Sequence, residues 1–236
     1  MKTKKTGKLL TILAMVAGFC FAVASCISVL ASPKAVAQTE NMRIVVDAGH
    51  GGVDGGVVGV VSGRKESDIN LAVSFLVKDR LTELGFSVTM TRSTEAGLYD
   101  TASPGFKRRD MEKRREICEA ASPLCVLSIH QNFFPSSASR GGQVFFREDS
   151  QQSMRLASSI QSQLNALYKK ENVKPRAAKP ADYYMLRITP PSLIIECGFL
   201  SNPKDDALLN TPLFCEKMAD SIVVGLIEEL NNLSST

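Results

Sequence analysis

Three short apolar runs in this chain of 236 residues each lead to a side chain that can carry out chemistry. They are residues 44–46 before His50, residues 125–129 before His130, and residues 193–195 before Glu196. Short apolar runs of this kind are typical of strands buried on both faces of a parallel sheet. Open α/β sheets place their chemistry just beyond the carboxyl ends of such strands. We therefore expect the two histidines of the chain to face one site, with Glu196 beside them.

The N-terminal segment has the layout of an export signal. Four lysines lie within residues 1–8, and residues 9–31 carry no charge. That stretch is long enough to remain as a membrane anchor. A signal peptide cleaved after Ala37 and a lipoprotein signal ending at Cys26 are alternatives, the second disfavoured by the apolar residues that follow Cys26. We expect a signal peptide or anchor over 1–31, a linker over 32–41, and a domain over 42–236 exported from the cytoplasm.

The basic charge of the chain resides in this leader. Beyond residue 37 the chain has 24 acidic residues against 23 lysines and arginines. A nearly neutral domain has no electrostatic reason to bind nucleic acid, and membrane contact is expected through the N-terminal segment only. The basic cluster at 107–115 contains interleaved acids and is typical of a solvated helix face with i,i+4 pairs.

Strand and helix patterns alternate from residue 42 onward. The expected strands are 43–47, 86–91, 124–129, 143–146, a short strand at 183–187, and 193–196. Four helices are expected. The first spans 67–84 and has an apolar stripe through Ile69, Val73, Leu76 and Leu84 that Arg80 interrupts, and the second spans 107–121. The third has Met154, Ala157, Ile160, Leu164 and Leu167 on one face, and the fourth runs from Pro212 to about 230. The first β-α-β units make parallel pairing the default. The sequence predicts a single α/β domain, with a twisted, mostly parallel sheet of about six strands and helices on both faces.

The histidines indicate a catalytic metal site. A catalytic zinc site uses about three protein ligands and keeps one position open. His50 and His130 supply two, and Glu66 is the third candidate because it lies where the glycine-rich loop meets a helix N-terminus. Asp68 is the alternative, although it is equally suited to capping that helix. The chain has no His-Glu-x-x-His motif, which excludes the common zinc peptidase helix.

Four cysteines lie beyond the leader, at positions 118, 125, 197 and 215. None forms a Cys-x-x-Cys pair, so neither a structural zinc site nor a dithiol redox motif is indicated. Buried free thiols are the expectation. Because Cys118 would end a helix and Cys125 begin a strand, a disulfide between them is left open.

Several motifs, in this order, resemble one enzyme family. They are Asp47-Ala48-Gly49-His50-Gly51-Gly52, Lys65-Glu66 with Asn70-Leu71, Thr91-Arg92, Ser128-Ile129-His130-Gln131-Asn132, and Glu196-Cys197-Gly198-Phe199. Together they resemble the zinc-dependent N-acetylmuramoyl-L-alanine amidases of the amidase_3 type over residues 42–230. The chain departs from the usual family motifs at Ala48, Phe133 and Cys118-Glu119, and none of these is a candidate ligand. The small size and the run 107–110 resemble the germination-specific cortex amidases of spore formers.

This resemblance implies specific roles. It implies that His50, Glu66 and His130 hold one Zn²⁺ and that Glu196 is the catalytic carboxylate. The substrate is then a peptidoglycan muropeptide, cleaved between the lactyl group of N-acetylmuramic acid and L-alanine. The narrower resemblance implies spore cortex maturation, between the membranes of a forming spore. The sequence leaves open whether an accessory protein is required.

Four further polar residues are candidates for support or for substrate contact. Asp47 is expected to orient His50 or to cap the glycine loop. Arg92 is expected to bind a peptide carboxylate or to pair with a neighbouring acid. Ser128 and Asn132 are expected to brace the His130 loop, with substrate contact as the alternative. The basic stretch 174–180 is expected to be a solvated loop, with muropeptide contact as the alternative.

Two other classes of function stay open at this point. The domain is alternatively a non-catalytic peptidoglycan-binding module, or a different zinc hydrolase such as a peptidase or a sugar deacetylase. The presence of both histidines and Glu196 at three strand ends favours an enzyme over a binding module.

Overall fold

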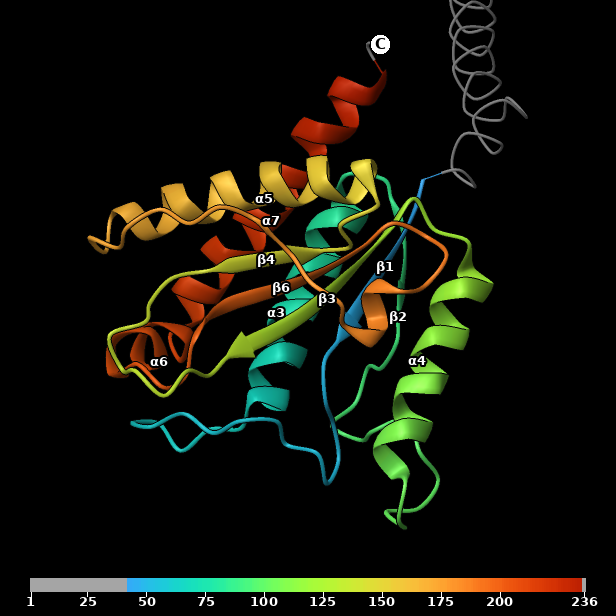
Figure 1. Cartoon of the computed structure of the whole chain (residues 1–236), viewed down its shortest axis with the longest axis horizontal. Coiled ribbons are helices and arrows are strands. Elements are labelled where there is room, and N and C mark those ends of the chain that lie inside the picture. The colour runs from blue at the N-terminus through green and yellow to red at the C-terminus, as the bar shows by residue number, and fades with distance from the viewer. Residues whose placement is uncertain (1–41, 235–236) are drawn as a thin grey trace, which may run out of the picture. The chain divides into compact units, whose positions relative to one another are not determined.

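A computed structural model describes residues 42–234, which form an α/β domain around a six-stranded sheet of order β2-β1-β3-β6-β4-β5 (Figure 1). The strands are β1 Arg43–Ala48, β2 Ser87–Met90, β3 Cys125–Asn132, β4 Gln143–Phe146, β5 Lys179–Pro180 and β6 Ser192–Phe199. The helices are α3 Glu66–Glu83, α4 Phe106–Ala121, α5 Gln151–Lys169, α6 Pro203–Leu209 and α7 Pro212–Ser234, with a 3-10 helix η1 at Tyr184–Leu186. The predicted fold class is confirmed.

The predicted leader at 1–31 and the linker at 32–41 lie outside the described residues. Within residues 42–234, no helix has both the length and the apolar character that a membrane crossing requires. The assignments of the N-terminal segment therefore stay predictions.

Parallel pairing brings three strand ends to one edge of the sheet. β1 pairs in parallel with β2 and β3, and β3 pairs in parallel with β6, whereas β4 runs antiparallel to β6. In the register of β3 and β6, His130 lies opposite Glu196. His50 follows the end of β1 by two residues. His50, His130 and Glu196, each at or just beyond the end of a parallel strand, therefore lie together at the carboxyl edge of the sheet, as predicted.

The helices cover both faces of the sheet unequally. α3, α5 and α7 pack on one face over the larger core, and α4 and η1 lie on the other face over a smaller one (Figure 1). Side chains alternate along a strand. Val46 and Leu127 accordingly belong to the larger core, while Val45 and Val126 belong to the smaller one. Burial on both faces explains why these strands are continuous apolar runs.

The apolar stripe of α3 differs from the predicted one. The fully buried apolar positions are Ile69, Val73, Val77 and Leu81, four residues apart. Leu84 is 54% exposed, so its assignment to the stripe was wrong. Arg80 does not interrupt the buried face, because it points outward and its Nε lies 2.8 Å from Asp220 Oδ1. The error was a register shift of one residue after Val73.

Two other local predictions were wrong, and one helix was missed. The segment 183–187 contains η1 rather than a strand, closed by the hydrogen bond from Leu186 N to Tyr183 O at 3.0 Å. Met154 lies one position off the buried face of α5 and is exposed. The sequence prediction also missed α6, which begins where the Asn202 side chain accepts hydrogen bonds from Lys204 N and Asp205 N.

All four described cysteines are buried free thiols, as expected. Cys118 belongs to the smaller core and Cys125 to the larger one, on opposite faces of the sheet. Cys118 near the end of α4 and Cys125 at the start of β3 are thus buried core residues, and no disulfide joins them.

Candidate active site

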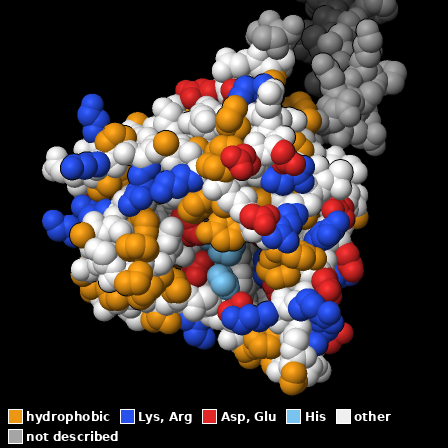
Figure 2. Space-filling model, viewed as in Figure 1, with side chains coloured by type: hydrophobic (Ala, Val, Ile, Leu, Met, Phe, Trp, Pro, Cys, Tyr) orange, Lys and Arg blue, Asp and Glu red, His pale blue; other side chains and the backbone are white. Residues whose placement is uncertain are grey.

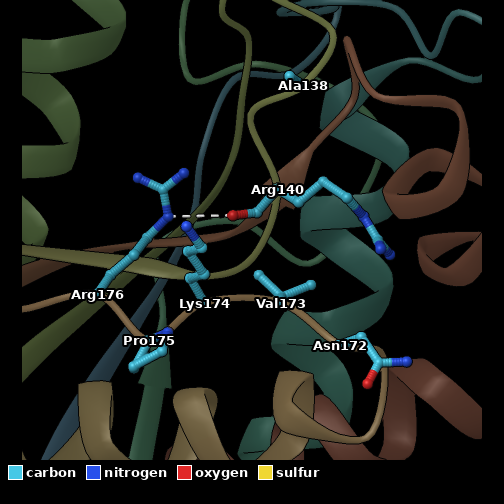
Figure 3. Close-up of a pocket in the computed structure, with 7 residues that line it drawn as sticks. All are labelled: Ala138, Arg140, Asn172, Val173, Lys174, Pro175 and Arg176. Atoms are coloured by element: carbon cyan, nitrogen blue, oxygen red, sulfur yellow. Dashed lines mark hydrogen bonds between the residues drawn. The ribbon is translucent and has the colours of Figure 1, made fainter.

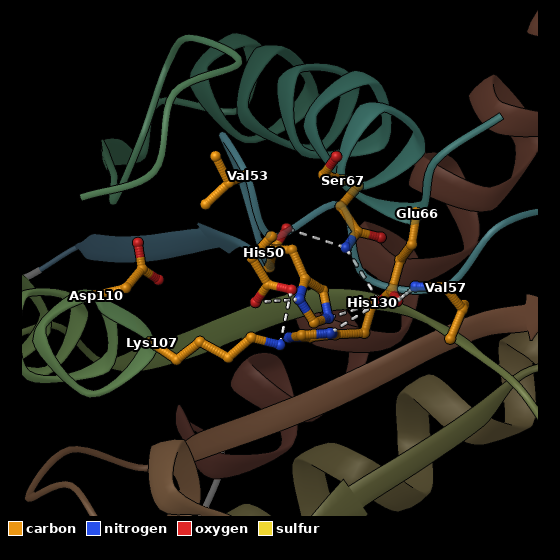
Figure 4. Close-up of polar contacts among 12 residues, drawn as sticks. His50, Val53, Val57, Glu66, Ser67, Lys107, Asp110 and His130 are labelled. Atoms are coloured by element: carbon orange, nitrogen blue, oxygen red, sulfur yellow. Dashed lines mark hydrogen bonds and ion pairs between the residues drawn. The ribbon is translucent and has the colours of Figure 1, made fainter. Parts of the chain in front are cut away.

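The structure brings His50, His130 and Glu66 together (Figure 4). The His130 Nδ1 lies 3.0 Å from Glu66 Oε1, and His50 Nε2 lies 3.3 Å from the same oxygen. The two imidazole rings are 5.1 Å apart between centroids and nearly perpendicular. Glu66 is the first residue of α3 and is buried, whereas both histidines are partly exposed. This geometry leaves one side of the cluster open to solvent.

Glycines allow these side chains to approach so closely. A Cβ atom at Gly49 would lie 2.3 Å from the His130 ring, which no larger residue can accommodate. Gly56 has a φ of +67°, and a Cβ there would lie 2.4 Å from Glu66 Oε2. The glycine-rich sequence after β1 is therefore required for steric reasons at the site.

The donor set fits a zinc ion. One atom from each of His50, Glu66 and His130 lies within 4.8 Å of the others, and imidazole nitrogen with carboxylate oxygen is a usual zinc ligand set. Backbone amides fix the Glu66 carboxylate, since Val57 N and Gln131 N each donate to it at 3.0 Å. Burial alone would raise the pKa of Glu66, but the two histidines outweigh it and hold the pKa well below its usual range. A ligand must be ionised in this way.

The alternative ligand Asp68 lies outside this donor set. One of its carboxylate oxygens accepts a hydrogen bond from Ser67 Oγ at 3.3 Å. Since it sits in the first turn of α3, its charge is favourable there for the helix dipole.

Glu196 is the remaining carboxylate of the site. Its Oε2 is buried and has no hydrogen-bond partner among the described residues. Burial, reinforced by the negative charge of Glu66 and opposed by the histidines, raises the pKa of Glu196 to about 7. A carboxylate with a raised pKa and a free oxygen is suited to taking and returning a proton near neutral pH.

Sequence reasoning missed the carboxylate that supports His50. Asp54 Oδ2 lies 3.0 Å from His50 Nδ1, and its other oxygen lies 3.1 Å from Lys107 Nζ. A tight turn closed between Gly51 and Asp54 brings this side chain back onto the ring. The signal available in the sequence was an acid four residues after His50 within a glycine-rich loop. This contact orients the imidazole in the manner usual for metal-ligating histidines.

Asp47 does not contact the His50 ring. Its carboxylate instead accepts hydrogen bonds from Thr91 Oγ1 and Arg114 Nη1, both at 2.6 Å, and from Ser128 Oγ. Arg114 in turn donates to the backbone oxygens of Ala48 and His50. Asp47 therefore supports the His50 loop through Arg114, not through the imidazole.

Arg114 was also missed, because the cluster at 107–115 was expected to be solvated throughout. That expectation is confirmed for the exposed pairs Arg108–Glu112 and Arg115–Glu119. Arg114, however, is 1% exposed and is paired with Asp110 as well as Asp47. Two carboxylates and two carbonyl groups satisfy its guanidinium, which makes the burial of its charge tolerable.

This buried pair predicts a pH dependence of stability. Burial raises the pKa of Asp47, but the Arg114 charge and the hydroxyl donors outweigh it and lower the pKa to about 2, from 3.8. A lowered folded-state pKa means that the stabilisation is present above about pH 4 and is lost as the pH falls towards 2, a loss of about 2 kcal/mol. In Asp47→Asn, urea unfolding should show a lower free energy of unfolding at pH 7 and a smaller fall between pH 4 and 2. The exposed-pair control Asp220→Asn should follow the parent; an unchanged acid limb in Asp47→Asn would contradict the argument.

The other three predicted support residues, Arg92, Ser128 and Asn132, make hydrogen bonds within the domain. Arg92 is buried and donates to backbone oxygens of Ala48, Gly49, Ser67 and Thr94, so backbone carbonyl groups occupy its guanidinium. Ser128 donates to Asp47, which agrees with a bracing role. The backbone oxygen of Asn132 accepts from Leu200 N at 2.8 Å, beyond an irregularity in the pairing of β3 with β6.

A cleft of about 360 Å³ opens over the cluster. Its lining includes His50, His130 and Asp54 together with Tyr183, Tyr184 and Met185 from the η1 segment. The histidine side chains reach the surface at the edge of a hollow (Figure 2). The cleft thus combines a polar reacting centre with an apolar wall, a usual arrangement for small organic groups.

Comparison with known proteins identifies the family. The family model for N-acetylmuramoyl-L-alanine amidase, Amidase_3, matches residues 44–228. A germination-specific N-acetylmuramoyl-L-alanine amidase of Bacillus subtilis is 35% identical over 188 residues, which cover 78% of this chain and 78% of that protein. N-acetylmuramoyl-L-alanine amidase LytC of the same organism is 28% identical over 187 residues, covering 78% of this chain and 34% of LytC.

Solved structures agree with this result. The CwlD amidase of Clostridioides difficile, solved in complex with the GerS lipoprotein, has a TM-score of 0.77 and 34% identity, covering 81% of this chain and 99% of that one. The catalytic domain of the amidase CwlV from Bacillus (Paenibacillus) polymyxa has a TM-score of 0.69 and 27% identity, covering 80% and 98%. Enzymes of this family are generally zinc-dependent. The chain belongs to the Amidase_3 family and is an N-acetylmuramoyl-L-alanine amidase acting on peptidoglycan.

Proposed function

We propose that this protein is a zinc-dependent hydrolase of the amide bond between the lactyl group of N-acetylmuramic acid and L-alanine. The observation that carries the proposal is the buried, unpartnered Oε2 of Glu196, in register with His130 and beside the His-Glu-His set. His50, Glu66 and His130 would hold the ion. When bound, zinc supplies Lewis-acid polarisation of the scissile carbonyl and lowers the pKa of water.

The side chains of the protein transfer the proton and position the histidines. Glu196 accepts the proton of the attacking water and delivers it to the alanine nitrogen, so that a neutral amine departs instead of an amide anion. Asp54 holds the His50 ring, and Lys107 keeps Asp54 charged and in place. Arg114 and Arg92 bind the backbone oxygens of the loop that carries His50, which fixes the loop without occupying the cleft.

We further propose a role in spore cortex maturation. The support is the similarity to the germination-specific Bacillus subtilis enzyme. The Clostridioides difficile relative was solved with a lipoprotein, which supports an accessory protein here as well. The lysine-rich leader supports export and attachment through residues 1–31, with the domain on the wall side. Protease added to intact protoplasts should then degrade the domain.

One digestion tests the reaction. Purified full-length protein, loaded with zinc, is incubated with isolated peptidoglycan, and the products are analysed by mass spectrometry. An amidase frees peptides with L-alanine amino termini and leaves the glycan intact. A deacetylase releases acetate, a peptidase cuts within the stem peptide, and a binding module releases nothing. The digestion is repeated with a candidate accessory lipoprotein added. Any of these last three results, obtained both without and with the lipoprotein, would refute the proposed reaction.

A further inference from the structure

A second cavity lies at the same edge of the sheet as the cleft. It has a volume of about 470 Å³ and is formed by two loops, residues 138–140 before β4 and residues 172–176 after α5 (Figure 3). Three cations line it, namely Arg140, Lys174 and Arg176, and no acidic residue does. The cavity is therefore a concentration of positive charge on a domain whose net charge is near zero.

The positive charge is only partly neutralised. Arg140 Nε lies 2.9 Å from the buried Asp205 carboxylate, so this guanidinium is paired. Arg176 donates through Nε to the Arg140 backbone oxygen at 3.0 Å and packs over the Phe199 ring. Lys174 makes no ion pair with the described residues, and it lines the same cavity as Arg176, two residues further along the loop (Figure 3). Two neighbouring cations without an acid repel each other, and a bound anion would relieve this repulsion.

The cavity is held open by fixed contacts. Asp205 accepts from Gly141 N at 2.7 Å as well as from Arg140, which secures the first loop. The Asn165 side chain bonds both the N–H and the C=O of Arg176, at 2.9 and 2.8 Å, which secures the second loop. A site whose backbone is already ordered loses little entropy when a ligand binds.

The cavity lies within a short peptide's length of Glu196. Phe199, under the Arg176 guanidinium, follows Glu196 by three residues in β6. Three residues of strand span about 10 Å. Gln143, three residues after Arg140, lies opposite Glu196 in the register of β4 and β6. An extended peptide that begins at the scissile bond would reach the cavity with its second or third residue.

We propose that Lys174 and Arg176 form a subsite for a free carboxylate of the peptidoglycan stem peptide, at its second or third residue. The inference rests on the proposed amidase function and adds which group of the substrate, beyond the scissile bond, the enzyme recognises. The geometry favours a carboxylate because Arg176 offers the two terminal nitrogens of a guanidinium, whose spacing matches two carboxylate oxygens.

The test compares two soluble muropeptides that differ only in whether the stem carboxylates are free or amidated. With zinc-loaded full-length protein, kcat/KM for the free acid is expected to be about tenfold higher, mainly through KM. Lys174→Gln and Arg176→Gln are expected to reduce this ratio to about threefold or less. Lys174→Arg keeps the charge and should keep the ratio, as should the control Lys78→Gln on α3. Thermal melting checks that each variant is folded.

Direct binding separates failure of the subsite from failure of the reaction. Stem tripeptide, free or amidated, is titrated into the same proteins and followed by calorimetry. Tighter binding of the free acid, lost in Lys174→Gln, supports the subsite even if no substrate is cleaved. Equal binding and equal cleavage of the two forms by the parent protein overturn the subsite while leaving the amidase intact. A preference that persists in both Lys174→Gln and Arg176→Gln overturns it too.

Discussion

His130→Ala is expected to abolish stoichiometric zinc binding. The full-length parent protein should carry close to one zinc per chain after loading and gel filtration, as measured by elemental analysis. The variant keeps only His50 and Glu66, two of the three donors that lie within 4.8 Å of each other. Loss of a direct ligand should weaken affinity by more than about 100-fold, since changes to residues that merely support ligands already cost 10- to 100-fold.

The matched control for this experiment is Asp68→Asn. Asp68 was the alternative third ligand in the sequence, and it lies outside the donor set in the fold. Its variant should retain zinc at the parent level. Full zinc content in His130→Ala, or zinc loss in Asp68→Asn, would show that the ligand set is wrong.

The convergence of His50, His130 and Glu196 could be predicted because it depends on strand order alone. Apolar runs mark parallel strands, and parallel strands end at one edge. Glu66 was harder to assign. It reaches the histidines because the chain doubles back after Asp54, with Val58 bridged to Lys65, and no local pattern announces that return. Proximity to a helix N-terminus was the only signal available.

Arg114 could not be distinguished from its charged neighbours by composition. The helical spacing of the apolar residues nevertheless indicated that Arg114 lies on the buried face of α4. Asp110, Arg114, Cys118 and Ala121 are the buried positions of α4, spaced by four, four and three residues. The last two are apolar and so mark the inward face, on which Arg114 also lies. Its burial then requires acids from elsewhere in the fold, and Asp47, 67 residues earlier, supplies one.

The antiparallel pairing of β4 with β6 was the main topological feature that the sequence prediction left out. The rule for β-α-β units predicts parallel pairing, but the link from β3 to β4 at 133–142 contains no helix. A crossover without a helix is the signal that a strand returns in the opposite direction. The consequence is functional, because this loop carries Arg140 to the edge where Glu196 lies.

Glu196→Gln is expected to lower kcat by about 100-fold or more while zinc remains bound. The substitution preserves the size of the side chain and removes its capacity to accept and return a proton. Glu196 lies outside the His-Glu-His donor set, so the variant should bind metal as the parent does. The measurement pairs zinc content with the rate of release of L-alanine amino termini from a soluble muropeptide.

The same chemical change at two other glutamates makes the result specific. Glu66→Gln should lose zinc and activity together, because its carboxylate is a proposed ligand. Glu119→Gln, on the partly exposed side of α4, should lose neither. Zinc loss in Glu196→Gln would make Glu196 a ligand, and activity within about threefold of the parent would remove it from proton transfer. Activity lost at both Glu66 and Glu196, with metal lost only at Glu66, is the pattern that separates a ligand from a proton carrier.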